Sequence, residues 1–453
     1  MLRRGSASII AAGLAAVFGI SSAQAQSLSE ALALAYANNP TLNSARAGLR
    51  ATDESVPQAL AGYRPQLSGS IQQSYTTTDS DGSTSESNTT SLGLTVTQPI
   101  FRGYRTVNGI RQAESSVLAQ RESLVSTEQN VLFDGAQSYM DVIRDSAIVT
   151  LRRSDIKFLE SEVRAARDRF NVGEGTRTDV SQAEAELASA QSNLNQSIAD
   201  LNSSRAIFRQ VIGRDPGKLK PDLSVLRLLP KNVQTALDIA HQQHPTIRQA
   251  QHSVDVALFQ VKSIEGELLP SVDLEGTVQR SINPNSATNV QDSATILGRV
   301  SIPIYQGGQV YSRVRQAKEQ LGQSRIQVDI ARDQIRATVI ASWGQYKASE
   351  ASIVAGQAGV RAEQLALDGV VEEQRVGQRT TQDVLDQQRS LVNARVSLVQ
   401  AQRDRIVAAY ALVSSVGGLT SSSLSLNVAA YQPTEHYSKV RDKWIGLRTP
   451  DGR

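Results

Sequence analysis

Two kinds of hydrophobic spacing alternate along the chain. Apolar residues recur at every second position, as in β-strands, over the stretches 67–75, 92–96, 272–278 and 294–302. Each pair of these stretches flanks a polar segment, 76–89 or 281–292, which we expect to be a loop. The second strand of each pair should end at Pro99 or Pro303, because proline has no N–H to donate to a sheet.

Long stretches with few helix breakers follow each strand pair. We expect helices over about 104–171 and 309–375, each roughly 100 Å long at 1.5 Å per residue. A shorter return helix should follow each, over about 179–212 and 383–416. The return helices carry residues seven apart: Leu187, Leu194, Leu201 and Phe208 in one, and Leu391, Leu398, Arg405 and Leu412 in the other. This spacing predicts coiled-coil packing, and the helix before each strand pair should extend the shorter column from its other end.

A short motif separates each long helix from its return helix. It combines a glycine, which suits a helix C-terminus, with a threonine and an aspartate at the spacing of a capping box, which opens a new helix. The residues are Gly173, Thr176 and Asp179 in the first copy and Gly377, Thr380 and Asp383 in the second. We therefore expect two tight turns, at about 172–179 and 376–383, each joining two helices.

These landmarks recur at a nearly constant offset, which indicates an internal duplication. Pro40 recurs as Pro245, 205 residues later, and Gly173 recurs as Gly377, 204 residues later. The predicted units are a first repeat over 26–222 with a β-hairpin at about 65–99, a second repeat over 223–426 with a β-hairpin at about 270–303, and a C-terminal tail over 427–453.

Residues 1–25 have the organisation of a secretory signal peptide. Arg3 and Arg4 precede a short apolar run, and Ala23-Gln24-Ala25 has the form of a cleavage site, so we expect cleavage after Ala25. The run is shorter than the roughly 20 residues of a membrane-spanning helix. No other stretch is long and apolar enough, so a membrane crossing would have to use strands.

Composition excludes several kinds of chemistry. The chain has no cysteine, which excludes disulfides, thiolate metal sites and cysteine nucleophiles. Its net charge is only +3 and no basic patch is interleaved with aromatic residues, which argues against nucleic acid as a partner. No catalytic set or phosphate loop stands out, so we expect neither an enzyme nor a cofactor. The spacing of His241, His244 and His252 raises the question of a metal site. We favour a capping or surface role instead, because the set is not repeated: the first repeat has Tyr36, Asn39 and Ala47 at these positions.

The strand pairs decide the expected architecture. Alternating strands of about ten residues are typical of outer-membrane barrels. One chain has four such strands, whereas the smallest bacterial barrels have eight, and open edges in lipid leave backbone groups unpaired. Protomers should therefore pool strands, and three would supply twelve around a lumen. The predicted fold is a mixed α/β membrane protein: a trimeric 12-stranded outer-membrane β-barrel continued by a long α-helical coiled-coil barrel in the periplasm.

The repeated motifs resemble those of the TolC-like outer-membrane efflux proteins, the outer-membrane channels of tripartite efflux and type I secretion systems. The resemblance covers nearly all of the mature chain. It rests on the Ala-Leu…Asn-Pro opening, the Gln-Pro-Ile-Phe-x-Gly strand exit over 98–103, and Val-Gly-x-x-Thr-x-x-Asp-Val at both turns. It implies a homotrimer in outer-membrane lipid, docked through a periplasmic adaptor (membrane fusion protein) onto an inner-membrane pump or ABC transporter. Such a duct passes drugs or secreted proteins and is not an enzyme.

The resemblance also implies roles for residues at the two turns, which it places at a periplasmic tip where the tunnel closes. These are lumen-facing gate carboxylates at Asp383 and Asp386, a lock between helices at Thr178, Asp179 and Arg379, and adaptor-docking tips at Val172, Gly173, Val376 and Gly377. Gln374 stands where the lock of a well-known member has a tyrosine. In a three-fold ring the two aspartates become six carboxylates, which would select cations and raise one another's pKa values.

Other interpretations stay open from the residues themselves. Asp383 and Asp386 also suit the first turn of a helix, where each carboxylate offsets the macrodipole by about 0.3–1 kcal/mol. Arg379 also suits a solvated surface. For the whole chain, the alternatives are a periplasmic coiled-coil adaptor without a pore, against which the strand pairs argue, and a periplasmic hydrolase. The tail over 427–453 is expected to pack partly on the helical waist through Tyr437, Val440 and Trp444.

Overall fold

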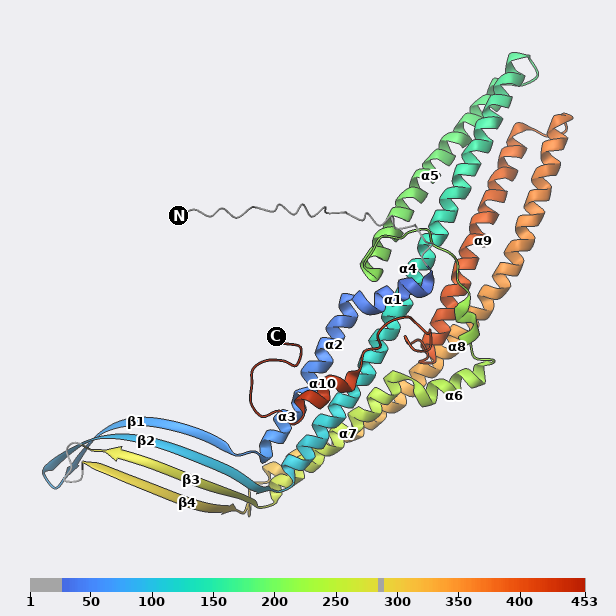
Figure 1. Cartoon of the computed structure of the whole chain (residues 1–453). Coiled ribbons are helices and arrows are strands. Elements are labelled where there is room, and N and C mark those ends of the chain that lie inside the picture. Colours follow the sequence, from blue (N-terminus) through green and yellow to red (C-terminus); the bar gives the residue numbers. More distant parts are fainter. Residues whose placement is uncertain (1–26, 284–288, 453) are drawn as a thin grey trace, which may run out of the picture.

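The structure, a computed structural model, describes residues 27–283 and 289–452. The predicted signal peptide and its cleavage after Ala25 lie outside the described residues. Figure 1 shows an elongated molecule with long helices at one end and a small sheet at the other. The two ends of the molecule therefore differ in structure, and the helical column connects them.

The sheet is antiparallel, and its four strands follow chain order. They are β1 (Gln66–Ser80), β2 (Ser83–Arg102), β3 (Ser271–Ile282) and β4 (Val290–Ser301). The β2–β3 pairing joins the two predicted hairpins, with Thr95 opposite Thr277. Strands β1 and β4 are the edges of the sheet.

The predicted loop over 76–89 is wrong. Strands β1 and β2 stay paired through this segment until Ser80 lies opposite Ser83. Only Asp81 and Gly82 form the turn, with φ angles of 50° and 78°. Two successive positive φ values are those of a type I′ turn, whose twist matches the flanking strands. The serine and threonine residues of this segment obscured the strand because both of its faces are polar.

The predicted strand ends also need correction. Strand β2 passes Pro99 and continues to Arg102, with a register shift between Pro99 and Phe101. A bulge at this position accommodates the missing donor of the proline. Strand β4 ends at Ser301, before it reaches Pro303.

Four long helices lie where the breaker-free stretches predicted them. Helices α4 (Arg105–Asn171) and α8 (Gln309–Arg375) have 67 residues each, whereas α5 (Arg177–Ile212) has 36 and α9 (Thr381–Ser415) has 35. Helix α4 pairs with α5 and α8 pairs with α9, and α9 also packs on α4 (Figure 1). Among the described residues, no helix contains a stretch long and apolar enough to cross a membrane.

Shorter helices extend the two short columns toward the sheet. They are α1 (Leu28–Asn38), α2 (Pro40–Asp53), α3 (Ser55–Leu60), α6 (Val233–Gln243) and α7 (Pro245–Glu265), with the 3₁₀ turns η1 (Ala61–Tyr63), η2 (Ser224–Leu228) and η3 (Gly266–Leu268). Asn39 donates to the Val211 carbonyl at the end of α5 (3.0 Å). Gly417, just after α9, lies against His244, so a Cβ there would come within 2.9 Å of the His244 Cα. The expected continuation of each column is confirmed.

The main hydrophobic core lies at the waist of the molecule, where α1, α4 and the ends of α5 and α9 meet. Tyr139, Phe208 and Tyr410 are its largest fully buried side chains. The heptad residues Leu201, Leu391 and Leu412 are buried as their spacing predicted. The last helix, α10 (Pro433–Val440), packs on α2, and its Val440 is fully buried. The expected packing of the tail is therefore confirmed for Val440 and the half-buried Tyr437, but it is wrong for Trp444, which is 65% exposed.

Candidate functional site

Each helical hairpin ends in a turn of the same design, at the end farthest from the sheet (Figure 1). In both turns a threonine hydroxyl accepts from an aspartate backbone N–H, while the aspartate carboxylate accepts from the threonine backbone N–H. These capping boxes are Thr176 with Asp179 and Thr380 with Asp383. Gly173 and Gly377 precede them with φ angles of 78° and 77°. The predicted helix–turn–helix geometry is confirmed at both places.

Asp383 and Asp386 lie in the first turns of α9. The Asp383 Oδ2 accepts from the Thr380 N–H (2.9 Å) and hydroxyl (2.8 Å). The backbone bond, followed by the hydroxyl bond, lowers the pKa of Asp383. Asp386 is exposed, accepts from Gln382 Nε2 (3.0 Å) and pairs with Arg389 (3.2 Å). Within one chain, Asp383 therefore caps a helix, as the simpler interpretation held.

The starts of the two return helices pack together, with Leu385 of α9 in the same buried cluster as Ala183 of α5. The pKa of Asp179 is lowered first by the side-chain hydrogen bond with Thr176, and a smaller contribution comes from the Thr381 hydroxyl at the start of α9. Arg379 pairs with Glu373 of its own turn, Nε to Oε2, at 2.8 Å. Thr178 is exposed. The structure thus packs α5 on α9 behind the turns, while Arg379 pairs with the last turn of α8 in its own hairpin.

Polar contacts that the sequence did not reveal join the hairpins just behind the turns. Gln388 of α9 donates to Asp155 of α4 (2.8 Å), and both side chains are buried. Arg389 makes a two-pronged contact with Glu186 of α5, at 3.0 and 2.6 Å. Their positions are 233 and 203 residues apart in the chain. Neither pair has a signal in local spacing, so only the folded chain reveals them.

The predicted docking tips are exposed apolar points. Val172 caps the end of α4 and Val376 caps the end of α8, and each is 71% exposed. Phe170 is a further exposed apolar side chain beside the first valine (46%). Both predicted docking tips therefore present an exposed apolar side chain at the end of the molecule.

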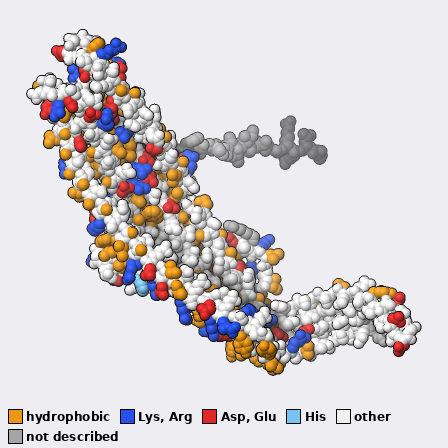
Figure 2. Space-filling view, turned by 180° about the vertical axis from the view of Figure 1, so that it is seen from behind, with side chains coloured by type: hydrophobic (Ala, Val, Ile, Leu, Met, Phe, Trp, Pro, Cys, Tyr) orange, Lys and Arg blue, Asp and Glu red, His pale blue; other side chains and the backbone are white. Residues whose placement is uncertain are grey.

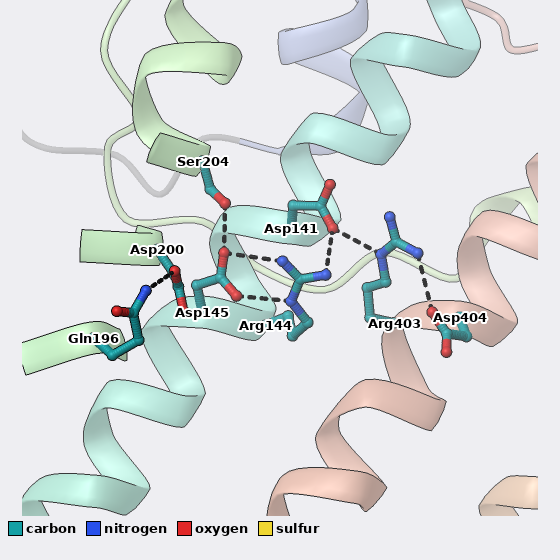
Figure 3. Close-up of polar contacts among 8 residues, drawn as sticks. All are labelled: Asp141, Arg144, Asp145, Gln196, Asp200, Ser204, Arg403 and Asp404. Carbon is teal, nitrogen blue, oxygen red and sulfur yellow. Dashed lines mark hydrogen bonds and ion pairs between the residues drawn. The ribbon is translucent and has the colours of Figure 1, made fainter. Parts of the chain in front are cut away.

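A polar network crosses the waist (Figure 3). Asp145 of α4 accepts two hydrogen bonds from Arg144 (2.7 and 3.0 Å) and one from Ser204 of α5. Asp141 of α4 bridges Arg144 (2.9 Å) and Arg403 of α9 (2.8 Å). The network therefore ties the long helix of the first hairpin to both return helices.

The two faces of the sheet differ in character. The strand register puts one apolar set on one face: Leu67, Ile71, Leu92, Leu94, Val96, Leu274, Val278, Ile296 and Val300. Most of these side chains are exposed, Ile296 by 83%. The opposite face is polar, with Thr95 bonded to Thr277 (3.3 Å) and Arg299 paired with Glu275 (3.5 Å). A sheet that exposes apolar side chains on one face and polar ones on the other suits lipid on one side and water on the other.

A groove marks the place where the helices meet the sheet. It is lined by apolar and aromatic residues that include Tyr104, Leu269 and Tyr311, and by the basic residues Arg111, Lys262, Arg315 and Lys318. Figure 2 shows hydrophobic side chains gathered at this junction with Lys and Arg beside them. Aromatic and basic side chains together are typical of a membrane–water interface.

The structure shows what one of the three histidines, His244, does. Its Nδ1 accepts from the Thr246 N–H (3.2 Å) and caps α7, and its side chain is buried. The capping role expected for this residue is confirmed. Within 27–283 and 289–452, no cluster of metal-ligating side chains is present.

The sequence profile of the family described as "Outer membrane efflux protein" matches residues 31–214 and 236–418. The chain belongs to this family. It is 44% identical to the outer membrane efflux protein BepC of Brucella suis, over 95% of this chain and 94% of that protein. It is 27% identical to the outer membrane protein TolC of Escherichia coli, over 90% and 86%. Its fold is similar to the CmeC outer membrane channel of Campylobacter jejuni, with a TM-score of 0.76 and 16% identity over 92% of this chain and 89% of that one.

Membership in this family confirms several of the predictions made from the sequence. This efflux protein resides in the outer membrane and extends into the periplasm, and it serves as an exit channel rather than an enzyme. The TolC-like resemblance is confirmed. The periplasmic adaptor and the hydrolase are therefore rejected as alternatives. The gate, lock and docking roles of individual residues are not decided by membership.

Proposed function

We propose that three copies of this chain form one exit duct, with a 12-stranded barrel in the outer membrane and a helical tunnel in the periplasm. The open sheet carries this proposal. Its apolar face suits lipid, but β1 and β4 present unpaired edges that lipid cannot satisfy. Because β1 and β4 run in opposite directions, β4 of one copy can pair with β1 of the next in the same antiparallel pattern.

The proposal treats the chain as two repeats, 26–222 and 223–426, followed by the tail. Each repeat supplies one strand pair and one helical hairpin, which supports the same role for both. The two segments matched by the family profile, 31–214 and 236–418, fall one in each repeat. A trimer would accordingly arrange six helical hairpins around one axis.

Oligomeric state tests the duct directly. The protein extracted from outer membranes should migrate as a trimer on a gel without heating and as a monomer after heating. It should also form conducting channels in planar bilayers. Recovery as a soluble monomer would reject the duct.

For the gate, we propose that Asp383 and Asp386 of each copy line the periplasmic constriction. They sit three residues apart at the start of α9 and so share a helix face. The first hairpin has Asp179 but carries Gln182 at the position of Asp386. The second hairpin would therefore carry most of the gate charge. In a ring, repulsion would work against the capping bonds that lower the pKa of Asp383.

The gate assignment predicts the effect of removing these charges. Asp383→Asn with Asp386→Asn should abolish the block of single-channel current by divalent cations, while the Asn at 383 can still accept the capping bonds. The matched control is Asp200→Asn with Asp238→Asn, which removes two exposed carboxylates elsewhere and should leave the block intact. Unchanged block in the first variant would reject the gate.

For the lock, we propose that Thr178, Asp179 and Arg379 hold adjacent hairpins together in the closed trimer. The packing of α5 on α9 just behind the turns, with Leu385 buried in one cluster with Ala183, supports it. Arg379 would then exchange Glu373 for a partner across a helix interface. Gln374 does not supply the ring of the tyrosine found in a well-known member, and instead donates weakly to Thr381 (3.4 Å).

For partners, we propose that Val172, Gly173, Val376 and Gly377 receive a periplasmic adaptor that links the duct to an inner-membrane pump or ABC transporter. The exposure of both valines at the end of the molecule supports this. Drugs and secreted proteins both fit such a duct, because the pump and adaptor choose the cargo. Deletion of the gene, with drug sensitivity and secreted proteins measured together, separates these two cargoes.

A further inference from the structure

The C-terminal tail is held on the helices by several separate contacts. The Tyr36 hydroxyl accepts from the Tyr431 N–H (3.0 Å). His436 Nδ1 lies 3.0 Å from the fully buried Asp53 of α2. Val440, at the end of α10, is fully buried. The segment that follows is therefore placed by its anchor and does not trail freely from the waist.

After α10 the chain reaches the root of the sheet. Arg64 donates to the Lys443 carbonyl (2.8 Å), and its guanidinium lies 4.8 Å from the centre of the Trp444 ring. Arg64 stands two residues before β1 begins at Gln66. Figure 1 shows the end of the chain curled beside α3, which leads into β1. Trp444 thus sits where the polypeptide turns from the helices into the strands.

The side chains at this place are apolar and exposed. Trp444 is 65% exposed, Ile445 is 90% exposed and Leu447 is 103% exposed. The flanking sequence carries basic residues at Lys439, Arg441, Lys443 and Arg448 and acidic residues at Asp442 and Asp451. Lys439 pairs with Glu435 (2.6 Å) and Arg441 with Glu114 (3.7 Å). An exposed tryptophan with flanking aliphatic and basic side chains has the composition of a membrane-interface anchor.

We propose that residues 441–448 insert Trp444, Ile445 and Leu447 into the headgroup layer of the periplasmic leaflet of the outer membrane. The inference rests on the proposed placement of the sheet in that membrane. Two observations favour a lipid surface as the occupant: the continuity with the strand root through Arg64, and the basic residues Lys443 and Arg448 on either side of the apolar side chains, which suit anionic headgroups. The tail would then fix the depth of the barrel by holding α2 and the root of the sheet at the membrane surface.

Tryptophan fluorescence tests the contact. The chain has two tryptophans, so Trp343→Phe leaves Trp444 as the only one. The full-length variant, confirmed as a heat-dissociable oligomer, is reconstituted into vesicles of phosphatidylcholine and phosphatidylglycerol with or without bromine on the acyl chains near the headgroup. Brominated lipid should reduce the Trp444 emission, and replacing Lys443 and Arg448 by Gln should weaken this quenching in phosphatidylglycerol. Equal emission in both kinds of vesicle would overturn the proposal.

A second reporter separates failure of the tail from failure of the duct. Trp343→Phe and Trp444→Phe combined with Ile296→Trp places one tryptophan on the apolar face of β4. Quenching of this reporter without quenching of Trp444 would reject the tail anchor alone. Trp444 that is shielded from aqueous iodide but not quenched by lipid would show another protein surface as its cover, and would also reject the anchor. Absence of quenching at both positions would reject the membrane placement of the sheet together with the tail.

Discussion

At the residue scale, the most telling pair is Asn39 and His244. Each stands before a proline and caps the helix that follows, Asn39 through Oδ1 to the Thr41 N–H (2.9 Å) and His244 through Nδ1 to the Thr246 N–H. Asparagine and histidine thus make the same kind of helix cap, but only histidine can change its charge near neutral pH. Burial lowers the pKa of His244 to about 4. The cap requires an unprotonated Nδ1, so capping and burial both favour the neutral ring.

This depressed pKa predicts an acid-sensitive contribution to stability. Below about pH 6.5, His244 is protonated in the unfolded chain but stays neutral in the folded chain. The free energy of unfolding therefore decreases as the pH drops toward 4, by up to about 3 kcal/mol per chain. His244→Asn should keep the cap and remove this term. The variant should therefore show a smaller decrease in melting temperature than the wild type between pH 7 and 4.5. A decrease of the same size in both proteins would contradict the assignment.

At the element scale, the long helix α4 is held to its neighbours by buried charge at the waist. Asp145 is 5% exposed and fully engaged by Arg144 and Ser204. Asp200, on α5, is exposed and bonds only within its helix, to Gln196 (2.9 Å). Figure 3 shows both aspartates, and they should matter unequally. Removal of Asp145 leaves buried partners unpaired, whereas water can solvate the groups around the exposed Asp200.

Removal of each carboxylate tests this difference. Asp145→Ala leaves Arg144 with one fewer partner and should lower stability by about 3 kcal/mol. Asp200→Ala should change it by about 0.5 kcal/mol or less. Hydrogen exchange of the α5 amides near Ser204 should accelerate in the first variant and stay close to wild type in the second. Similar exchange in both would mean that the waist network does not hold α5.

At the scale of the whole molecule, the two-faced sheet bears on the proposed assembly of three copies. Neighbouring positions on β4 face opposite environments, with Ile296 in the apolar set and Thr295 opposite Thr277 in the polar set. One chain leaves the apolar face and both edges unsatisfied. Assembly and membrane insertion are therefore expected to be one coupled event, since neither lipid nor water suits the isolated sheet.

Arginine at these two positions distinguishes the faces. Ile296→Arg puts a charge near the middle of the lipid-facing band and should cost about 2–4 kcal/mol, so that little oligomer accumulates in the outer membrane. Thr295→Arg faces the lumen and should assemble normally. The amount of heat-dissociable oligomer in outer-membrane fractions measures both. Normal assembly of Ile296→Arg would place the apolar face away from lipid.

Local chemistry allowed much of the molecule to be predicted. The capping boxes at Thr176 and Thr380, the lengths of α4 and α8 and the apolar strands depend on residues close in sequence, so spacing alone identified them. The Asp81-Gly82 turn also had a local signal, an Asp-Gly pair between alternating residues, but the polar composition of 76–89 concealed it.

Only the tertiary structure shows which residues far apart in the chain contact one another. The contact of Arg389 with Glu186, the burial of Asp155 beside Gln388, and the arrival of Trp444 at the root of the sheet depend on how the helical columns lie against one another. The partner of Arg379 could not be predicted either. From the sequence, Arg379 could pair with Glu373 of its own hairpin or with an acidic residue of the other hairpin, and only the structure shows that it pairs with Glu373. Helix periods, caps and strand alternation are encoded within one or two turns of chain, so the sequence alone determined them. Charge pairing and burial across columns need the path of the whole chain, so only the fold could choose among the available partners.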